Sequence, residues 1–470
     1  MNDFFLSLML LGSVSGAGTA PFWSTAGCHG TAPESTGAVT LLGAGMDYDS
    51  SKTLQWHWGA SLGALADGDG TALIPDQAYA GLRWKVLDLD IGIKHRETLC
   101  TGADPSLGSL SVTGCSLAWS GNCRSLPGYT LSLRPVDIPF TRGRVRLYGS
   151  WGDYMTTDSR YVQGSLVHNF RAGLEFKITG ALKFTAALDH FAVWGGTVPG
   201  FGKVPVTLEN YRRMCLGLEG GADATLMDRE NTFGDQRGAE LLALEYDGPR
   251  WNVELRHEIP YEDRSGMKFQ NFPDGVNTLR FSRRDRDALL TDIVFEYHST
   301  MWQSGEYERR PATADEIASG DPRLHCNEEG EYFLVTGGKD NYGNNYEYKS
   351  GWTFHGRSAG NPLFFPCGTL DGTLTRNEVC GGIENNRLRA FHLGLSGKMW
   401  RKAPYRLMLT LSRNCGTYND PLGPLWQFSS GFQVRIPLPL HLSLVPGIYA
   451  DCGNFLPRNV GATLGIRYLL

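Results

Sequence analysis

Short segments in which apolar and polar side chains alternate recur along most of this 470-residue chain. In residues 54–62, for example, every second residue is apolar, and the residues between them are Gln55, His57, Gly59 and Ser61. A period of two places successive side chains on opposite faces of an extended strand. The alternation therefore predicts an all-β fold, and few other patterns would constrain a chain of this length as strongly.

The polar faces of these segments favour a membrane barrel over a soluble sandwich. Residues 251–258 carry charges of both signs on one face, and residues 288–299 carry Asp292, Glu296 and His298 on one face, which is typical of a wet lumen. The alternation runs to Leu470. The sequence contains no run of 18 or more apolar residues, so it predicts no membrane helix. Barrel strands need only about ten residues each to cross a membrane. We predict a transmembrane antiparallel β-barrel of about 18 strands in the cell outer membrane, with long polar extracellular loops.

The expected strands and loops follow from this pattern. The candidate strands lie at residues 36–46, 53–64, 77–85, 87–97, 115–121, 129–134, 143–152, 164–177, 181–194, 212–219, 237–246, 251–258, 276–283, 288–299, 350–356, 388–400, 404–413, 427–436, 440–449 and 459–469. This is slightly more than expected, so a few should be ribbons within loops. The long polar inserts lie at residues 98–114, 195–211, 259–287, 303–349 and 366–387.

Residues 1–20 have a different pattern. An apolar run over residues 4–14 precedes Ser15, Gly16 and Ala17, which resembles a signal peptide with a small-residue cleavage site. The basic residue expected before such a run is missing, since Asn2 and Asp3 stand there. Two interpretations stay open for residues 1–20, a signal peptide or a truncated start. Residues 21–470 are expected to form a single outer-membrane barrel domain.

Composition and motifs exclude several classes of function. The net charge is −5 at pH 7 and there is no basic stripe, so we expect no nucleic-acid partner. The sequence has no Gly-x-Ser-x-Gly, no His-Glu-x-x-His and no phosphate-binding loop, so we predict that it is not an enzyme. We expect no cofactor. His168 and His190 could face each other on adjacent strands, but a third metal ligand is missing, so a hydrogen-bond network is favoured over a metal site.

The ten cysteines permit disulfides in an exported protein. None lies in a Cys-x-x-Cys motif or in zinc-site spacing. The plausible loop disulfides are Cys367 with Cys380, and one pair among Cys100, Cys115 and Cys123.

Residues 340–364 are rich in Asn, Tyr, Trp and Gly and poor in aliphatic residues. Aromatic rings can pack on the CH faces of sugars, while amides and carboxylates bind sugar hydroxyls. The candidate glycan-binding residues here are Asp340, Asn341, Tyr342, Asn344, Asn345, Tyr346 and Tyr348. The alternative is a loop whose side chains close its own turns. Asn122 and Arg124, at a predicted strand end, are further candidates that could line the lumen, with a turn stabilised by Asn122 as the alternative.

Several stretches resemble one family. Residues 337–364 resemble the Asp-Asn-Tyr to Gly-Asn-Pro-Leu segment of the capsule assembly protein Wzi family of Gram-negative bacteria. Residues 116–127, 188–196 and 21–23 resemble other stretches of that family in the same order, although Cys123 replaces its usual small residue.

This resemblance implies an outer-membrane lectin that binds capsular polysaccharide and helps to assemble or anchor the capsule at the cell surface. The implied partners are capsular or extracellular polysaccharide, outer-membrane lipids and other capsule-export components. The alternative function is an outer-membrane diffusion channel or transporter for small solutes.

Overall fold

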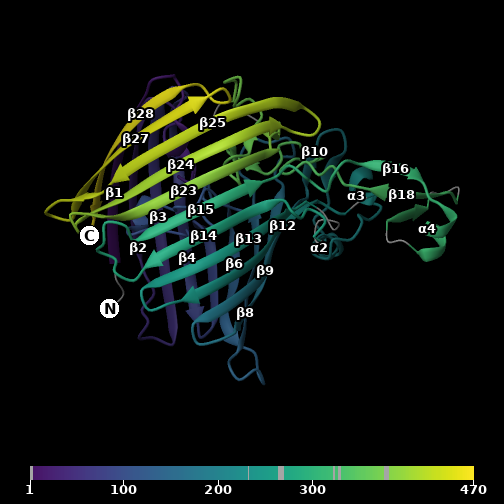
Figure 1. The fold of residues 1–470 in the computed structure, drawn as a ribbon, viewed down its shortest axis with the longest axis horizontal. Coiled ribbons are helices and arrows are strands. Elements are labelled where there is room, and N and C mark those ends of the chain that lie inside the picture. The colour runs from purple at the N-terminus through teal and green to yellow at the C-terminus, as the bar shows by residue number, and fades with distance from the viewer. Residues whose placement is uncertain (1–3, 231, 263–268, 321–322, 327–329, 375–380) are drawn as a thin grey trace.

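Antiparallel strands close into a barrel in the computed structural model of the protein, with a smaller lobe of short elements extending from one end (Figure 1). The structure describes residues 4–230, 232–262, 269–320, 323–326, 330–374 and 381–470. The strands of the barrel wall are β1 (Phe4–Ser15), β2 (Gly37–Met46), β3 (Leu54–Asp67), β4 (Gly70–Trp84), β5 (Leu87–Ile93), β6 (Pro127–Asp137), β7 (Val145–Met155), β8 (Leu166–Lys177), β9 (Leu182–Trp194), β12 (Asp235–Asp247), β13 (Trp251–Tyr261), β14 (Gly275–Arg283), β15 (Asp292–Ser299), β23 (Leu388–Met399), β24 (Ala403–Gly416), β25 (Pro421–Val434) with β26 (Ile436–Pro437), β27 (Leu442–Gly453) and β28 (Asn459–Leu469).

The wall is a closed antiparallel β-barrel of 18 strands within the described residues. Each strand pairs with the next wall strand along the chain, and β26 continues β25 against β27. Closure comes from β1, which pairs with β2 on one side and with β28 on the other. The predicted fold class is therefore confirmed.

Apolar and polar residues alternate along the wall strands because the two faces of the wall meet different surroundings. On β3, Leu54 and Trp56 are half exposed on the outer face, as expected for side chains that meet lipid. His57, the residue after Trp56, points inward, is buried, and lies 2.5 Å from Asp90 of β5. Apolar side chains thus cover the outside, and polar groups pair inside.

The two ends of the barrel differ. One end, called the turn end here, carries short connections at residues 85–86, 178–181, 248–250 and 400–402. The other, the loop end, carries residues 94–126, 195–234 and 300–387. The chain starts and finishes at the turn end, whereas α2, α3 and α4 lie at the loop end (Figure 1). Long loops at one end and short turns at the other are typical of outer-membrane barrels, whose long loops are extracellular.

Short elements within the loops complete the fold. These are α1 (Phe22–Thr25), η1 (Pro105–Leu107), β10 (Gly196–Val198), β11 (Gly202–Val204), α2 (Leu208–Cys215), α3 (Leu226–Glu230), β16 (Glu308–Pro311), α4 (Ala314–Ser319), β17 (Leu324–Cys326), β18 (Tyr332–Thr336), β19 (Thr353–Phe354), β20 (Arg357–Ser358), β21 (Phe365–Pro366) and β22 (Ile383–Asn385). Across the part of the chain that the structure describes, no helix combines the length and apolar character needed to span a membrane.

Three predicted strands are wrong. Residues 115–121 form an irregular segment inside the barrel, and residues 350–356 form only part of the small β19–β20 hairpin. Residues 212–219 were expected to be a strand, but α2 ends there. The Thr207 hydroxyl caps α2 by accepting a hydrogen bond from the Asn210 amide at 3.1 Å.

The wall also starts earlier than expected. We placed residues 1–20 outside the barrel, yet Phe4–Ser15 forms β1. Leu11 on this strand packs inside the barrel against Val39, Leu65 and Ile74. Phe5, Met9 and Leu11 make half of the inner face apolar and the other half is serine, so the strand carries no charge and resembles the apolar run of a signal peptide.

Candidate functional site

The lumen of the barrel is occupied by the connection between β5 and β6. Backbone amides of this connection donate to acidic side chains on the wall, from Val112 to Glu296 at 2.9 Å and from Leu117 to Glu258 at 3.1 Å. On another wall strand, His392 Nε2 lies 2.9 Å from the Leu110 carbonyl oxygen. The connection therefore crosses the interior rather than lying over its mouth.

Residues 100–115, called the plug segment here, are held by cationic side chains. The arginines that donate to its carbonyl oxygens are Arg256 to Cys115 at 3.1 Å, Arg280 to Thr101 at 3.4 Å, Arg286 to Gly102 at 2.8 Å, Arg406 to Ser109 at 3.1 Å and Arg467 to Ser106 at 2.7 Å. Hydrogen bonds from a charged donor are stronger than neutral ones. Since Arg286 belongs to a connection at the turn end, the plug segment reaches deep into the barrel.

A disulfide closes the plug segment on itself. Cys100 and Cys115 are bonded, with their Cα atoms 6.2 Å apart. This confirms that one pair forms among Cys100, Cys115 and Cys123. The other predicted pair cannot be followed, because Cys380 lies outside the described residues.

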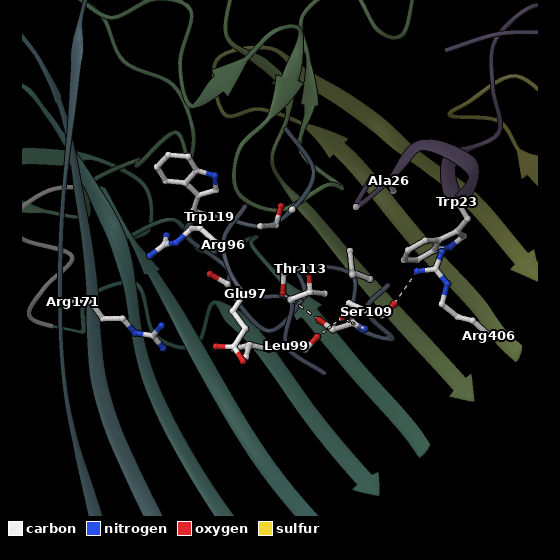
Figure 2. Close-up of a pocket in the computed structure, with 18 residues that line it drawn as sticks. Trp23, Ala26, Arg96, Glu97, Leu99, Ser109, Thr113, Trp119, Arg171 and Arg406 are labelled. Carbon is white, nitrogen blue, oxygen red and sulfur yellow. Dashed lines mark hydrogen bonds between the residues drawn. The ribbon is translucent and has the colours of Figure 1, made fainter. Parts of the chain in front are cut away.

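A cavity lies beside the plug segment (Figure 2). It is lined by Trp23 of α1 and by Trp119, while Arg96, Arg171 and Arg406 reach it from different sides. Its volume is about 100 Å³. One water takes up about 30 Å³ of liquid, so the cavity has room for a few waters.

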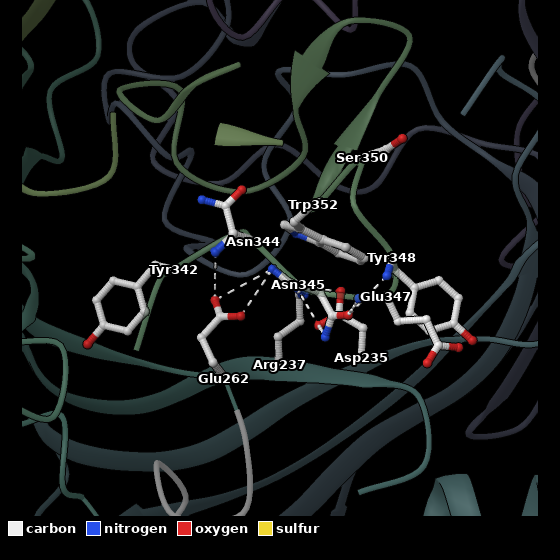
Figure 3. A network of polar contacts seen from close by, with 12 residues as sticks. Asp235, Arg237, Glu262, Tyr342, Asn344, Asn345, Glu347, Tyr348, Ser350 and Trp352 are labelled. Atoms are coloured by element: carbon white, nitrogen blue, oxygen red, sulfur yellow. Dashed lines mark hydrogen bonds and ion pairs between the residues drawn. The ribbon is translucent and has the colours of Figure 1, made fainter. Parts of the chain in front are cut away.

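The first half of residues 340–364 is anchored to the wall through one buried arginine (Figure 3). Arg237 pairs with Asp235 at 2.5 Å and with Glu262 at 3.3 Å, and its guanidinium lies 5.4 Å from the centre of the Trp352 ring. The Gly343 amide donates to Glu262 at 2.9 Å, which attaches residues 340–352 to this network. Burial raises the pKa of Glu262 to about 8, although the nearby Arg237 opposes the shift.

A second acidic pair lies behind this segment. Burial, together with the neighbouring Glu347, raises the pKa of Asp228 to about 7. Burial also raises the pKa of Glu347, although its side chain accepts a hydrogen bond from the Thr225 hydroxyl. The segment is therefore packed against carboxyl groups that tend to hold their protons.

The predicted asparagines of this segment make hydrogen bonds within the protein. Asn344 donates to the Ile383 carbonyl at 2.9 Å and accepts from the Ile383 amide at 2.7 Å. Asn345 accepts from the amides of Glu347 and Tyr348, which closes a turn, and Asn341 accepts from Asn344 at 3.0 Å. The geometry matches the alternative in which the side chains close the loop's own turns.

The other predicted residues of the segment differ in exposure. Tyr342 is fully buried and donates to Asp274 at 3.2 Å, and Tyr348 is buried with its hydroxyl 3.4 Å from the Gly195 carbonyl oxygen. Asp340 is buried and accepts from the Ser304 hydroxyl at 2.9 Å. Only Tyr346 among these four residues presents most of its surface, 76%, to solvent. In this structure the two buried tyrosines support the loop, and a glycan-binding role for the segment stays a prediction.

Asn122 and Arg124 lie apart from Tyr346. Asn122 is buried, donates to the Ser358 carbonyl at 3.0 Å and accepts from the Gly27 amide at 3.3 Å. Arg124 donates to the Gly30 carbonyl at 3.4 Å. Both residues therefore join the loop between β1 and β2 to the loops above the lumen, and their glycan-binding role also stays a prediction.

The plug segment was not predicted from the sequence. Arg256 belongs to the charged face of residues 251–258 that was predicted to line a wet lumen, and it pairs with Glu254 at 3.0 Å. Arg256 also donates to the Cys115 carbonyl. The signal for a folded segment here was the pair of cysteines, Cys100 and Cys115, at the two ends of the predicted insert.

No protein-family model and no curated protein matches this sequence. Among solved structures, the outer-membrane protein Wzi of Escherichia coli matches with a TM-score of 0.56 at 12% identity, covering 98% of this chain and 83% of that one. The Pseudomonas aeruginosa protein OccK3 (OpdO) matches with a TM-score of 0.48 at 13% identity, covering 100% of this chain and 96% of that one.

The likeness to the Wzi structure bears on the fold. Together with the closed wall and its apolar outer face, it defines the class of the protein as an outer-membrane β-barrel. The protein is accordingly located in the outer membrane, as predicted.

Proposed function

We propose that this protein is an outer-membrane lectin that binds capsular or extracellular polysaccharide at its loop end and helps to assemble or anchor the capsule. The observation that carries the proposal is the filled lumen. A segment closed by a disulfide, whose carbonyl oxygens accept hydrogen bonds from five arginines of the barrel, crosses the lumen and has a cavity of about 100 Å³ beside it. A barrel filled in this way offers its loop surface, rather than a pore, to polysaccharide.

Two further observations support the proposal. The Escherichia coli protein Wzi is described as a carbohydrate-binding β-barrel involved in group 1 capsule assembly, and its fold spans almost all of this chain. The four stretches that resemble the Wzi family lie at the loop end or inside the barrel near it. The proposed partners are the polysaccharide, outer-membrane lipids and other capsule-export components, and the proposed role is not catalytic.

Binding and deletion test the proposal together. The purified barrel should bind the surface polysaccharide extracted from its own source cell in a saturable manner. Deletion of the gene should release that polysaccharide from the cells into the medium. A barrel that binds none of this polysaccharide, with a capsule that stays cell-associated after deletion, would overturn the proposal.

Planar bilayers test the alternative of a diffusion channel or transporter. The lectin proposal expects the wild-type barrel to insert without stable conductance steps. Reproducible open steps in the wild type, combined with absence of polysaccharide binding, would favour the channel instead.

A further inference from the structure

Four residues from two loop-end connections meet on the surface of the barrel: the side chains of three of them lie together, and the fourth, Trp302, joins them through its main-chain carbonyl while its indole donates to the Gln270 carbonyl at 3.1 Å. We call them the cationic patch: Trp302, Lys339, Arg387 and Tyr418. Trp302 and Lys339 belong to the longest loop, Arg387 precedes β23, and Tyr418 lies in the connection between β24 and β25. Trp302 and Lys339 are exposed, whereas Arg387 and Tyr418 are half-buried.

The ring of Tyr418 is the centre of the patch. The Arg387 guanidinium carbon lies 3.8 Å from the ring centre, and the Lys339 ammonium nitrogen lies 5.9 Å from it. The Tyr418 hydroxyl donates to the Trp302 carbonyl at 2.9 Å. Cations held near an aromatic face are attracted to its electron density, so the ring keeps two positive charges close together without a carboxylate between them.

A rigid frame holds the patch in place. Buried Asp274 accepts hydrogen bonds from the amides of Trp302 and Gln303, at 2.9 and 2.8 Å, and from the Tyr342 hydroxyl. Lys339 has a φ of 49°, in the left-handed region that non-glycine residues rarely adopt. Residues held in such conformations cost free energy and persist where surrounding structure fixes them, often at ligand sites.

The two cations keep hydrogen-bonding capacity. The Lys339 ammonium makes no hydrogen bond or ion pair with any residue that the structure describes. Arg387 donates to the Met301 carbonyl at 3.5 Å, and its buried Nε atom has no partner within the described residues. Among the nearby carboxyl groups, Asp274 and Asp340 are buried and hydrogen-bonded, and Glu306 is exposed.

We infer that the cationic patch binds a carboxylate-bearing, acidic polysaccharide. Trp302, with 48% of its surface exposed, offers an aromatic ring for the CH surface of a sugar, and Lys339 and Arg387 offer N–H donors for a carboxylate of the same polysaccharide. The inference rests on the proposed lectin function and adds to it the place of binding and the acidic class of sugar.

Glycan binding by single variants tests the inference. The probe is the surface polysaccharide extracted from the source cell, used as isolated and after chemical reduction of its carboxyl groups to alcohols. Trp302→Ala and Lys339→Gln should each weaken binding of the native polysaccharide about tenfold, a typical effect for an aromatic or cation contact in a site. Carboxyl reduction should weaken wild-type binding by a similar factor and make Lys339→Gln indistinguishable from the wild type.

The turn end supplies matched controls. Lys85 lies 4.8 Å from the centre of the Trp84 ring, which is the same kind of pair on the opposite side of the membrane. Lys85→Gln and Trp400→Ala, the latter an 82% exposed tryptophan, should leave binding unchanged.

Each outcome separates the two proposals. A wild type that binds, with Trp302→Ala and Lys339→Gln equal to it, would overturn the cationic patch and leave the lectin function standing. Equal binding of native and carboxyl-reduced polysaccharide would overturn the acidic class. If Trp302→Ala and Lys339→Gln bind polysaccharide like the wild type but bind lipopolysaccharide vesicles more weakly, the patch contacts lipid headgroups and the inference is overturned. A wild type without any polysaccharide binding would overturn both the lectin function and the patch.

Discussion

The plug segment and the cationic patch both depend on arginine and lysine, but they use them in opposite ways. At the plug segment, donors such as Arg406 and Arg256 are occupied by carbonyl oxygens or carboxylates. At the cationic patch, Lys339 makes no polar bond to a described residue, and Arg387 lies on a tyrosine ring. The comparison teaches that positive charge alone does not mark a binding site. What matters is how many of its donors the fold already occupies.

Excision of the plug segment should have the largest effect. Because the Cα atoms of Cys100 and Cys115 are 6.2 Å apart, two glycines can replace residues 101–114 without moving the ends. The variant should show stable conductance steps in planar bilayers, whereas the wild type should be silent. Cys100→Ser/Cys115→Ser, which keeps the arginine bonds, is the control and should stay mostly closed. A silent excision variant would show that other loops close the lumen.

Removal of Arg237 should have the next largest effect, here on the free energy of unfolding. This residue extends the comparison to a cation whose ion-pair partners are both acidic side chains. Arg237→Ala leaves Asp235 and Glu262 buried without their cation. Breaking such a buried pair costs about 3–5 kcal/mol in the free energy of unfolding. Urea unfolding in detergent, followed by gel mobility, measures the change, with exposed Arg401→Ala as the control. A loss below about 1 kcal/mol would contradict the proposed anchoring.

Substitution of one cation whose donors are occupied, Arg406, and of one whose ammonium is not, Lys339, should change the free energy of unfolding by smaller amounts. Arg406→Ala leaves the Ser109 carbonyl and Gln433 without their charged donor, so it should cost about 2–3 kcal/mol. Lys339→Gln should change stability by less than about 0.5 kcal/mol, as surface substitutions usually do. The same unfolding assay measures both. Equal losses in the two variants would remove the distinction between the plug segment and the cationic patch.

The smallest effect should be a pH dependence at Glu262. Its folded pKa of about 8 lies above the unfolded value of about 4.3, so the folded state holds the proton more tightly. The contribution of Glu262 to stability is therefore full below about pH 4.3 and declines as the pH rises to about 8. Glu262→Gln should flatten this part of the curve of unfolding free energy against pH. A curve of unchanged slope in the variant would assign the dependence to other groups.

Much of the wall could be predicted from the sequence because a barrel strand has two different neighbours, lipid outside and a polar interior inside. The predictions failed where this contrast is absent. At β1 the inner face holds Phe5, Met9 and Leu11 between serines and has no charged residue, so the strand looked like a leader. At residues 115–121 an alternating stretch lies wholly inside the barrel, where the Leu117 amide bonds to the Glu258 carboxylate instead of to a strand.

The candidate site was harder to predict, because a sequence shows which groups are present and not which are already bonded. Asn344 and Asn345 have the chemistry of a sugar site, yet the Asn344 amide is bonded to the Ile383 backbone and the Asn345 side chain closes a turn of its own loop. Trp302, Tyr418 and Arg387 are far apart in the sequence and come together only through loop packing. Pattern analysis of single segments has no means to find such a cluster.

The closure of the wall by β1 has a consequence for how the protein is assembled. Ser7 pairs with Leu469, so the final seam joins strands from opposite ends of the chain. Pairing across such a separation is slow, because the loop-closure entropy must be lost before the contact forms. The arginines that donate to carbonyl oxygens of the plug segment come from β13, β14, β24 and β28 and from the connection after β14, all later in the chain than the plug segment itself. Closing the seam and docking the plug segment therefore both need late parts of the chain, and the order of these two events decides whether the barrel matures empty or filled.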